Sequence, residues 1–326
     1  MVAHKLGPSI AAGNPVVLKP ASATPISAIK LAEVLLDAGL PADWLQVVCG
    51  SGSEVGSRIV EDPAVTAISF TGSPEVGWGI RSQVPHKRVS LELGSNAPLI
   101  VAADGDWERA ADGARIHAFS HAGQSCISTQ RVIVEEAVAD EFIARLVANV
   151  EALVVGDPID PQTDVGPLID DQNRDRVKQW IDAAVGAGAQ LLTGGEVNPD
   201  GTLQPTLIGE PPLACEVWAE EVFGPVATVH RARDFEHAIE LANNSKFGLQ
   251  AGVFTRDLGQ GLRAARQLEF GGVLINEVPT FRADQQPYGG VKESGTAREG
   301  PIFAVRELTE LGLLDKLDKD RSRLRS

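Results

Sequence analysis

The sequence has few cysteines, no long apolar run and no signal-like start. Its three cysteines, Cys49, Cys126 and Cys215, are odd in number and far apart, which fits a reducing compartment better than a disulfide framework. No stretch approaches the ~20 consecutive apolar residues of a membrane span, and Met1 to Pro8 holds no apolar run of signal-peptide length. We therefore expect a cytoplasmic protein that does not bind membranes.

Positive charge and metal-ligand motifs are also scarce. There are 29 basic against 44 acidic residues, a net charge of -15, and basic residues cluster only in the tail Lys316 to Arg325. This balance disfavours nucleic acid as a partner. There is no CxxC, no HExxH and no tight His/Asp cluster, so we predict no metal site.

What remains is an ordinary globular composition, with 43% apolar and 22% charged residues in 326 positions. That length predicts one large or two medium domains. From Asn14 to Gly94, short β-branched runs alternate with helical patterns in a βαβαβαβ order, which predicts an α/β fold with a doubly wound parallel sheet. The helix after the first strand is expected to be capped by Thr24, with Pro25 at its first position and Gly39 beyond its end.

Longer helices dominate after Gly94 and predict a second α/β domain. We expect a partial dinucleotide-binding domain at 1–94, a second domain at 95–300 and a C-terminal segment at 301–326. Only four strands are expected before Gly94, fewer than the five or six of a free-standing dinucleotide-binding sheet, as if the chain began within a domain. The turn-rich segment from Pro279 to Gly300 reads as a long loop of the kind that carries function.

Cys126 lies in the flexible segment Gly123-Gln124-Ser125-Cys126-Ile127-Ser128, where a thiol can be exposed and approached closely. A thiolate suits attack on an aldehyde carbon because it adds reversibly and then leaves as a thioester. The alternative is a small buried hydrophobic side chain. His121 lies five residues earlier, but the orienting Asn or Asp of a Cys/His hydrolase is not evident.

Glu92 lies near the end of the strand Val89 to Gly94, between two leucines. Burial there would raise its pKa, as a general base at neutral pH requires, and ligands bind at the carboxyl edge of parallel sheets. The alternative is a strand-end glutamate that is exposed to solvent or paired with Arg88.

The turn from Phe70 to Gly77 joins a strand to a helix, so its free N–H groups suit a phosphate. It lacks the GxGxxG fingerprint, and tight turns without ligands are common. Lys19, after the first strand, is expected at the same sheet edge and could also be an ordinary solvated lysine.

Seven segments, taken together, resemble the aldehyde dehydrogenase superfamily in order and spacing over nearly the whole chain. They are Lys5-Leu6-Gly7-Pro8 with Ala12-Gly13-Asn14, Val17-Leu18-Lys19-Pro20, Phe70-Thr71-Gly72-Ser73, Leu91-Glu92-Leu93-Gly94, Gly123-Gln124-Ser125-Cys126, Glu220-Glu221-Val222-Phe223-Gly224-Pro225 and Pro287-Tyr288-Gly289-Gly290-Val291-Lys292-Glu293-Ser294-Gly295.

The resemblance implies NAD(P)-dependent oxidation of an aldehyde to a carboxylic acid. Cys126 would be the nucleophile and Glu92 the base that activates the water hydrolysing the thioester, while Lys5 would line the inner cleft. The remaining residues would contact the cofactor: Lys19 and Ser22 at the adenosine ribose, Gly72, Ser73 and Gly77 at the pyrophosphate, and Glu221 and Phe223 at the nicotinamide ribose and ring. Leu93 and Gly94 would be further cofactor-binding residues.

The oxyanion needs preorganised donors, and one would be the Cys126 backbone N–H. The family's second donor is an asparagine that precedes the point matching Met1, as do the earlier cofactor-domain segments. We therefore expect the chain, as given, to be weakly active or inactive. By the same resemblance the segment Leu308 to Leu317 would be an oligomerisation strand, and the complete protein a homodimer or homotetramer.

Cofactor and substrate are less closely specified. Many NAD-preferring members have a glutamate where this sequence has Ser22, so we expect NADP to be tolerated. The loop Val278 to Gln286, with Phe281 and Arg282, resembles the corresponding loop of subfamilies that act on small oxygenated or anionic aldehydes such as lactaldehyde or glyceraldehyde phosphate. Arg282 would bind a carboxylate or phosphate, or else form a surface ion pair.

Two other functions stay open. A coenzyme A-acylating enzyme would keep the thioester but generally lacks the base, so Glu92 favours hydrolysis. The chain could also be a non-catalytic fragment that pairs with full-length subunits.

Overall fold

The computed structural model describes residues 1–310, so most of the strand expected at 308–317 lies outside the described residues. The described residues form two compact units, one made of residues 1–59 with residues 299–310, the other of residues 60–298. The domain boundaries expected near residues 94 and 300 stay predictions. Within residues 1–310, no helix has the length and apolar character needed to cross a membrane.

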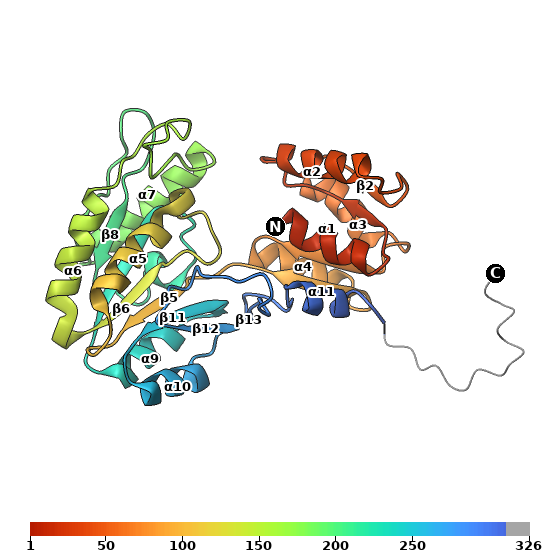
Figure 1. Cartoon of the computed structure of the whole chain (residues 1–326). Coiled ribbons are helices and arrows are strands. Elements are labelled where there is room, and N and C mark those ends of the chain that lie inside the picture. Colours follow the sequence, from red (N-terminus) through yellow and green to blue (C-terminus); the bar gives the residue numbers. More distant parts are fainter. Residues whose placement is uncertain (311–326) are drawn as a thin grey trace, which may run out of the picture. The chain divides into compact units, whose positions relative to one another are not determined.

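The first unit is built on a parallel pair of strands, β1 and β2. Leu6 of α1, Ala32 of α2 and Leu45 of β2 form its core, and α1 also packs against α11 (Figure 1). The pattern from Asn14 onward did not predict α1. Its elements are α1 (Val2–Ala11), β1 (Val16–Leu18), α2 (Ile26–Asp37), β2 (Leu45–Val47), the π-helical turn η1 (Gly52–Gly56), α3 (Ser57–Glu61), whose end passes into the second unit, and α11 (Pro301–Glu307).

The start of α2 differs slightly from the prediction. Pro25, not Thr24, is the N-cap, and no side chain caps the helix. The far end is as predicted, because Gly39 follows the C-cap Ala38 with φ +98°, a conformation that glycine adopts without strain.

The second unit begins with another parallel pair, β3 (Ala67–Thr71) and β4 (Arg88–Glu92), joined by α4 (Pro74–Gln83). The α/β fold is as predicted. However, among residues 1–310 the four N-terminal strands form two separate pairs, with no ladder joining β1–β2 to β3–β4.

A seven-stranded sheet in the order β12-β11-β5-β6-β9-β8-β7 fills the rest of this unit, and every neighbouring pair is parallel except β7–β8. Its elements are β5 (Pro98–Val101), α5 (Trp107–Phe119), η2 (Ser120–Gly123), β6 (Arg131–Glu135), α6 (Glu136–Glu151), α7 (Asp171–Gly186), β7 (Gln190–Thr193), β8 (Thr206–Gly209), α8 (Glu216–Ala219), β9 (Val226–Ala232), α9 (Phe235–Asn243), β10 (Phe247–Gly248), β11 (Gln250–Phe254), α10 (Leu258–Gln267), β12 (Gly272–Ile275) and β13 (Val291–Lys292).

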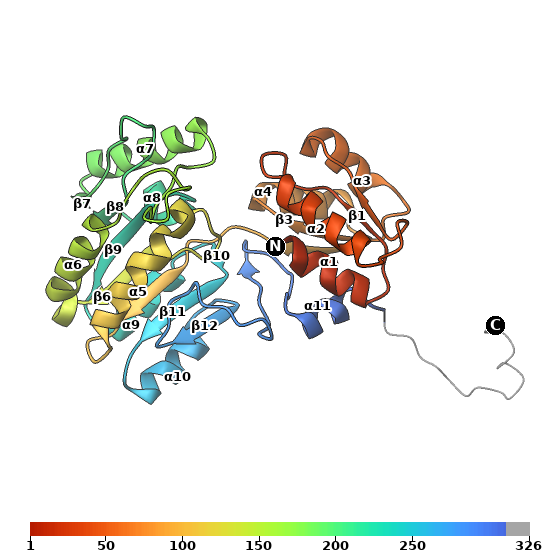
Figure 2. The ribbon, with the colours of Figure 1, turned by 45° about the horizontal axis from the view of Figure 1, so that its top comes forward.

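Helices cover both faces of this sheet, as Figures 1 and 2 show. On the interior strand β5, Leu99 and Val101 pack with α5 and α6, whereas Ile100 packs with α9 and α10. This alternation follows from the two-residue repeat of a strand. Burial on both faces explains why β5 reads as a continuous apolar run, which the sequence pattern did not single out as a strand.

The segment from Pro279 to Gly300 is mostly irregular, as predicted. Its short strand β13 pairs antiparallel with β10. It then returns to the end of β4, where Gly295 forms a bridge with Glu92 and the Leu93 N–H donates to the Ser294 carbonyl at 3.0 Å. The loop is thereby fixed beside the strand that carries Glu92.

Candidate functional site

A tight reversal after α5 presents Cys126. His121, Ala122 and Gly123 have φ of +53°, +55° and +70°, so three successive residues are left-handed. A Cβ on Gly123 would lie 2.0 Å from the Gly224 carbonyl oxygen, so only glycine fits there. Cys126 follows in a half-buried turn, and its Sγ lies 3.3 Å from the hydroxyl of Tyr288.

Glu92 and Cys126 lie around the same tyrosine. Tyr288 is 5% exposed and Glu92 4% exposed. Burial, the Cys126 sulfur and the charge of Glu92 together raise the pKa of Tyr288 well above its ordinary value. The charge of Glu92 thus acts on the hydroxyl that contacts the thiol, and the loop that carries Tyr288 is joined to the end of β4 by the bridge between Glu92 and Gly295.

The side chain of Arg282 covers the same tyrosine. Its guanidinium carbon lies 4.0 Å from the centre of the Tyr288 ring, a cation–π contact, and its positive charge favours ionisation of the hydroxyl. The sequence reasoning gave Tyr288 no role. The available signal was that this residue, within Pro287-Tyr288-Gly289-Gly290, is the only tyrosine of the chain.

A second acidic side chain, Glu221, is held by the segment that follows β4. Its Oε1 accepts a hydrogen bond from the Ser95 N–H at 2.9 Å. Burial raises the pKa of Glu221 to about 7, although that hydrogen bond and the charge of Arg176 act in the opposite direction. A Cβ on Gly94 would lie 2.6 Å from Oε2, so a glycine at 94 lets the carboxylate approach.

Two buried amides fix the backbone around Glu221. Gln130 donates to the carbonyls of Val217 at 3.1 Å and Glu220 at 2.7 Å, and its own oxygen accepts from the Val222 N–H at 2.9 Å. Asn96 donates to the Trp218 carbonyl at 3.0 Å. The sequence reasoning missed both residues, because a buried amide that binds distant backbone leaves no local pattern.

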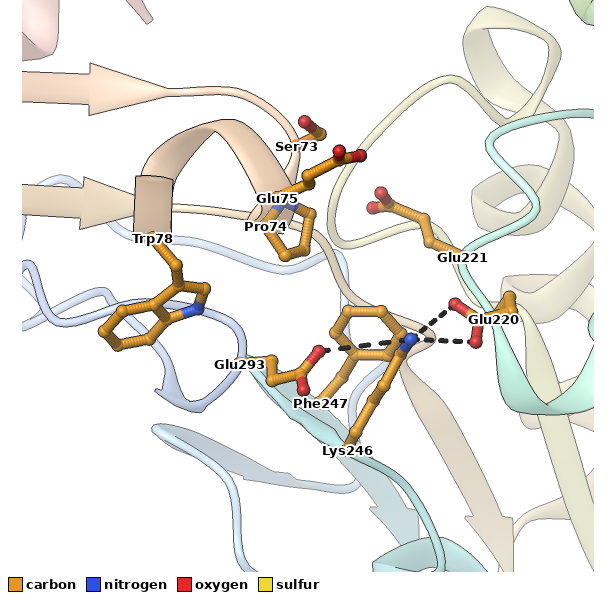
Figure 3. A pocket seen from close by; sticks show the side chains of 9 residues that line it. All are labelled: Ser73, Pro74, Glu75, Trp78, Glu220, Glu221, Lys246, Phe247 and Glu293. Carbon is orange, nitrogen blue, oxygen red and sulfur yellow. Dashed lines mark hydrogen bonds and ion pairs between the residues drawn. The ribbon is translucent and has the colours of Figure 1, made fainter. Parts of the chain in front are cut away.

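Glu221 faces a cleft of about 480 Å³ at the start of α4 (Figure 3). In Figure 3 its carboxylate extends toward the turn that carries Ser73 and Glu75. Ser73 is the N-cap of α4 and accepts from the Val76 N–H at 3.4 Å. The lining residues are Ser73, Pro74, Glu75, Trp78, Glu220, Glu221, Lys246, Phe247 and Glu293.

The cleft suits a ligand with hydroxyl and phosphate groups. Glu221 is an acceptor for hydroxyls, and the N-terminal end of the ten-residue helix α4 attracts negative charge. One cation, Lys246, offsets part of the negative charge of the other carboxylates, since its Nζ lies 2.7 Å from Glu220 and 3.9 Å from Glu293.

The glycines of the turn have a packing role as well. A Cβ on Gly77 would lie 2.4 Å from a methyl carbon of Leu93, and one on Gly72 would lie 2.5 Å from the Phe70 ring. Phe223 is 40% exposed and left-handed, with φ +49°.

The remaining predicted site residues belong to the first unit. Lys19 donates to the carbonyls of Pro20 at 2.8 Å and Gly50 at 3.4 Å, and the Ser22 hydroxyl also donates to Gly50, at 3.0 Å. Lys5 Nζ lies 3.7 Å from a carboxylate oxygen of Glu299. Among the described residues, no group of three or more His, Cys, Asp or Glu side chains is arranged to hold a metal ion.

Comparison with known proteins gives the family. Residues 1–313 match the model of the aldehyde dehydrogenase family. The chain belongs to this family. It is 45% identical over 311 residues to a 3-sulfolactaldehyde dehydrogenase of Priestia aryabhattai, covering 95% of this chain and 65% of that protein. It is 42% identical over 316 residues to a lactaldehyde dehydrogenase of Methanococcus vannielii, covering 95% and 67%.

Solved structures of aldehyde dehydrogenases share the fold. The glyceraldehyde-3-phosphate dehydrogenase GapN of Methanocaldococcus jannaschii, complexed with NADP, matches with a TM-score of 0.90 at 38% identity, over 94% of this chain and 67% of that one. An NAD-dependent aldehyde dehydrogenase of Sinorhizobium meliloti matches with a TM-score of 0.92 at 34% identity, over 94% and 62%. The chain thus spans about two thirds of the length of the aldehyde dehydrogenases that it matches, 65% for the first relative.

Proposed function

We propose that this aldehyde dehydrogenase-family chain carries the thiol and base of NAD(P)-dependent aldehyde oxidation, with Cys126 as nucleophile and Glu92 as general base. The observation that supports the proposal is that the Cys126 sulfur lies 3.3 Å from the Tyr288 hydroxyl, on which the charge of Glu92 also acts. A half-buried thiol can be approached by a small carbonyl compound, and a carboxyl that is 4% exposed suits proton abstraction near neutral pH.

In the proposed reaction the Cys126 thiolate adds to the aldehyde carbon and forms a thiohemiacetal. A bound nicotinamide supplies the hydride acceptor that converts this adduct to a thioester. Glu92 then takes a proton from water, which attacks the thioester, releases the carboxylic acid and frees the sulfur. The Cys126 N–H would donate to the oxyanion.

The cofactor would occupy the cleft between α4 and Glu221. Gly72, Ser73 and Gly77 would receive the pyrophosphate at the start of α4, and Glu221 with Phe223 would hold the nicotinamide ribose and ring. Leu93 and Gly94 would also contact the cofactor. By the family resemblance alone, Lys19 and Ser22 would contact the adenosine ribose, and Lys5 would line the inner cleft. This proposal extends the family resemblance to a cleft whose Ser73 and Glu221 line one space.

Substrates with a negative charge or hydroxyls are favoured by Arg282. Its guanidinium stacks on the ring whose hydroxyl touches the nucleophile, so an anionic group on a short aldehyde lies within the field of a fixed cation. The relatives named for 3-sulfolactaldehyde and lactaldehyde are consistent with this class.

A trapping experiment tests the mechanism, because one turnover suffices even for a weakly active chain. The purified 326-residue protein is mixed with NADP or NAD and either 3-sulfolactaldehyde, which carries a sulfonate, or neutral lactaldehyde, and acyl adducts are located by peptide mass spectrometry. We expect an adduct on Cys126 that accumulates in Glu92→Gln, is absent in Cys126→Ser and forms faster with anionic aldehydes unless Arg282 is changed to Gln. An adduct that clears equally fast in Glu92→Gln, or that needs coenzyme A to clear, contradicts the role given to Glu92.

Cofactor choice is tested separately by binding. The Ser22 hydroxyl donates a hydrogen bond to the Gly50 carbonyl and has no negative charge that would repel a 2′-phosphate. We therefore expect NADP to bind with an affinity within about tenfold of that of NAD, a difference of no more than about 1.4 kcal/mol. Ser22→Glu should weaken NADP selectively in a calorimetric titration, and strict exclusion of NADP by the unchanged chain would count against the proposal.

A further inference from the structure

Tyr288 contacts the sulfur directly. Its hydroxyl oxygen lies 3.3 Å from Cys126 Sγ, within the range of a hydrogen bond to sulfur, and either atom can be the donor when the thiol is neutral. A thiolate has no proton to give. In the reactive form of Cys126 the tyrosine is therefore the donor.

The surroundings keep the proton on Tyr288. Burial raises the pKa of this hydroxyl well above its ordinary value, and the charges of Cys126 and Glu92 add to that effect. Arg282 acts in the opposite direction and, stacked at 4.0 Å on the ring face, also restricts the ring. The hydroxyl thus keeps its proton and can donate it in a hydrogen bond to the sulfur.

We propose that Tyr288 is a catalytic residue whose hydroxyl donates a hydrogen bond to the Cys126 thiolate and increases the fraction of the sulfur that is ionised. The inference rests on the proposed role of Cys126 as nucleophile. Tyr288 keeps its proton throughout, so it makes and breaks no covalent bond.

Two opposing effects follow from such a bond. A donor stabilises a half-buried thiolate, and hydrogen bonds to charged groups are strong enough to move a titration by about one unit. A stabilised thiolate is also a weaker nucleophile, with a Brønsted coefficient of about 0.4 to 0.5. Loss of the hydrogen bond should therefore lower the reaction rate of Cys126 near neutral pH, because less of the sulfur is ionised. It should also raise the rate constant of the thiolate itself.

Tyr288→Phe isolates the hydroxyl, because it keeps the ring that Arg282 covers. The test measures the alkylation rate of Cys126 by iodoacetamide as a function of pH, resolved by peptide mass spectrometry. We expect the midpoint of the profile to rise by about one unit. The rate near neutral pH should fall about threefold and the high-pH plateau should rise about threefold, so the two profiles cross.

Controls separate this outcome from loosened packing. Thr129→Val removes a buried hydroxyl, three residues from Cys126, that has no hydrogen-bond partner, and should leave the profile unchanged. Exposed Cys49 and half-buried Cys215 serve as internal references, since a loosened fold would accelerate Cys215 as well. In the unsubstituted protein, the absorption band of the only tyrosine should shift with the same midpoint as alkylation.

The inference would be overturned if the alkylation profiles of Tyr288→Phe and the unsubstituted chain coincided. It would also be overturned if the tyrosine absorption band did not change as Cys126 ionises. These results are independent of turnover. Crossing profiles without any acyl adduct on Cys126 would keep the hydrogen bond and remove the proposed function, whereas adduct formation with superimposed profiles would do the reverse.

Discussion

The buried surroundings of Glu221 favour the protonated form of its carboxyl group more than water does. It accepts a hydrogen bond from Ser95 at 2.9 Å, yet burial raises its pKa from 4.5 to about 7. The proton is therefore bound more tightly in the folded than in the unfolded chain. Folding is favoured by this group below about pH 4.5, and that contribution is lost as the pH rises through about 7.

Glu221→Gln should remove this pH dependence. The amide keeps an oxygen to accept from Ser95 and carries no charge, so the variant should melt at nearly the same temperature as the unsubstituted chain below about pH 4.5 and a few degrees higher at about pH 8. Glu220→Gln is the control, because that side chain is 40% exposed and paired with Lys246. Thermal melts across this range check it, and an equal gain for both variants would refute the burial argument.

At the scale of elements, the reversal at Gly123 presents Cys126. Gly123 has a left-handed backbone, and a Cβ there would lie 2.0 Å from the Gly224 carbonyl oxygen. A glycine is therefore required in η2 because of a segment far away in the sequence. In contrast, Gly79 lies inside α4, and nothing lies within 4 Å of the Cβ it would carry.

These two glycines predict opposite effects of one substitution. Gly123→Ala should destabilise the chain by about 1 to 3 kcal/mol from backbone strain, with more from the clash. Gly79→Ala should stabilise α4 by about 0.5 to 1 kcal/mol, because alanine restricts the unfolded chain and favours helix. Urea denaturation of both variants checks the pair, and the argument fails if Gly123→Ala proves as stable as Gly79→Ala.

At the scale of the molecule, Arg131 links the large sheet, α9 and the segment after Glu92. It is fully buried on β6 and donates to the carbonyls of Asn96 at 2.8 Å, Leu241 at 3.2 Å and Ala242 at 2.9 Å. Burial lowers its pKa to about 9, so it stays charged at neutral pH. The last turn of α9 suits a cation, because helix carbonyls there lack partners.

Arg131→Met should destabilise the second unit by about 3 kcal/mol or more, since it leaves buried carbonyls without donors. Arg231, on the neighbouring strand β9, forms surface ion pairs with Glu136 and Asp140. Arg231→Met should therefore cost less than about 1 kcal/mol. The free energy of unfolding of both variants, measured in urea, tests this prediction. Equal losses of stability would show that the burial of Arg131 does not matter.

The sequence by itself determined the α/β class, most helices and strands after Asn14 and the long loop from Pro279 to Gly300, because each follows from a local repeat or turn signal. It also indicated Cys126 and Glu92, which lie in short motifs that resemble those of the aldehyde dehydrogenase family.

Only the tertiary structure decided which groups meet. The contact of Tyr288 with Cys126, the ring stacked beneath Arg282, the amides that fix Glu221 and the separation of the N-terminal strands into two pairs depend on residues far apart in the chain. Burial, hydrogen bonding and close approach between such segments leave no local pattern, so the amino-acid order alone does not reveal them.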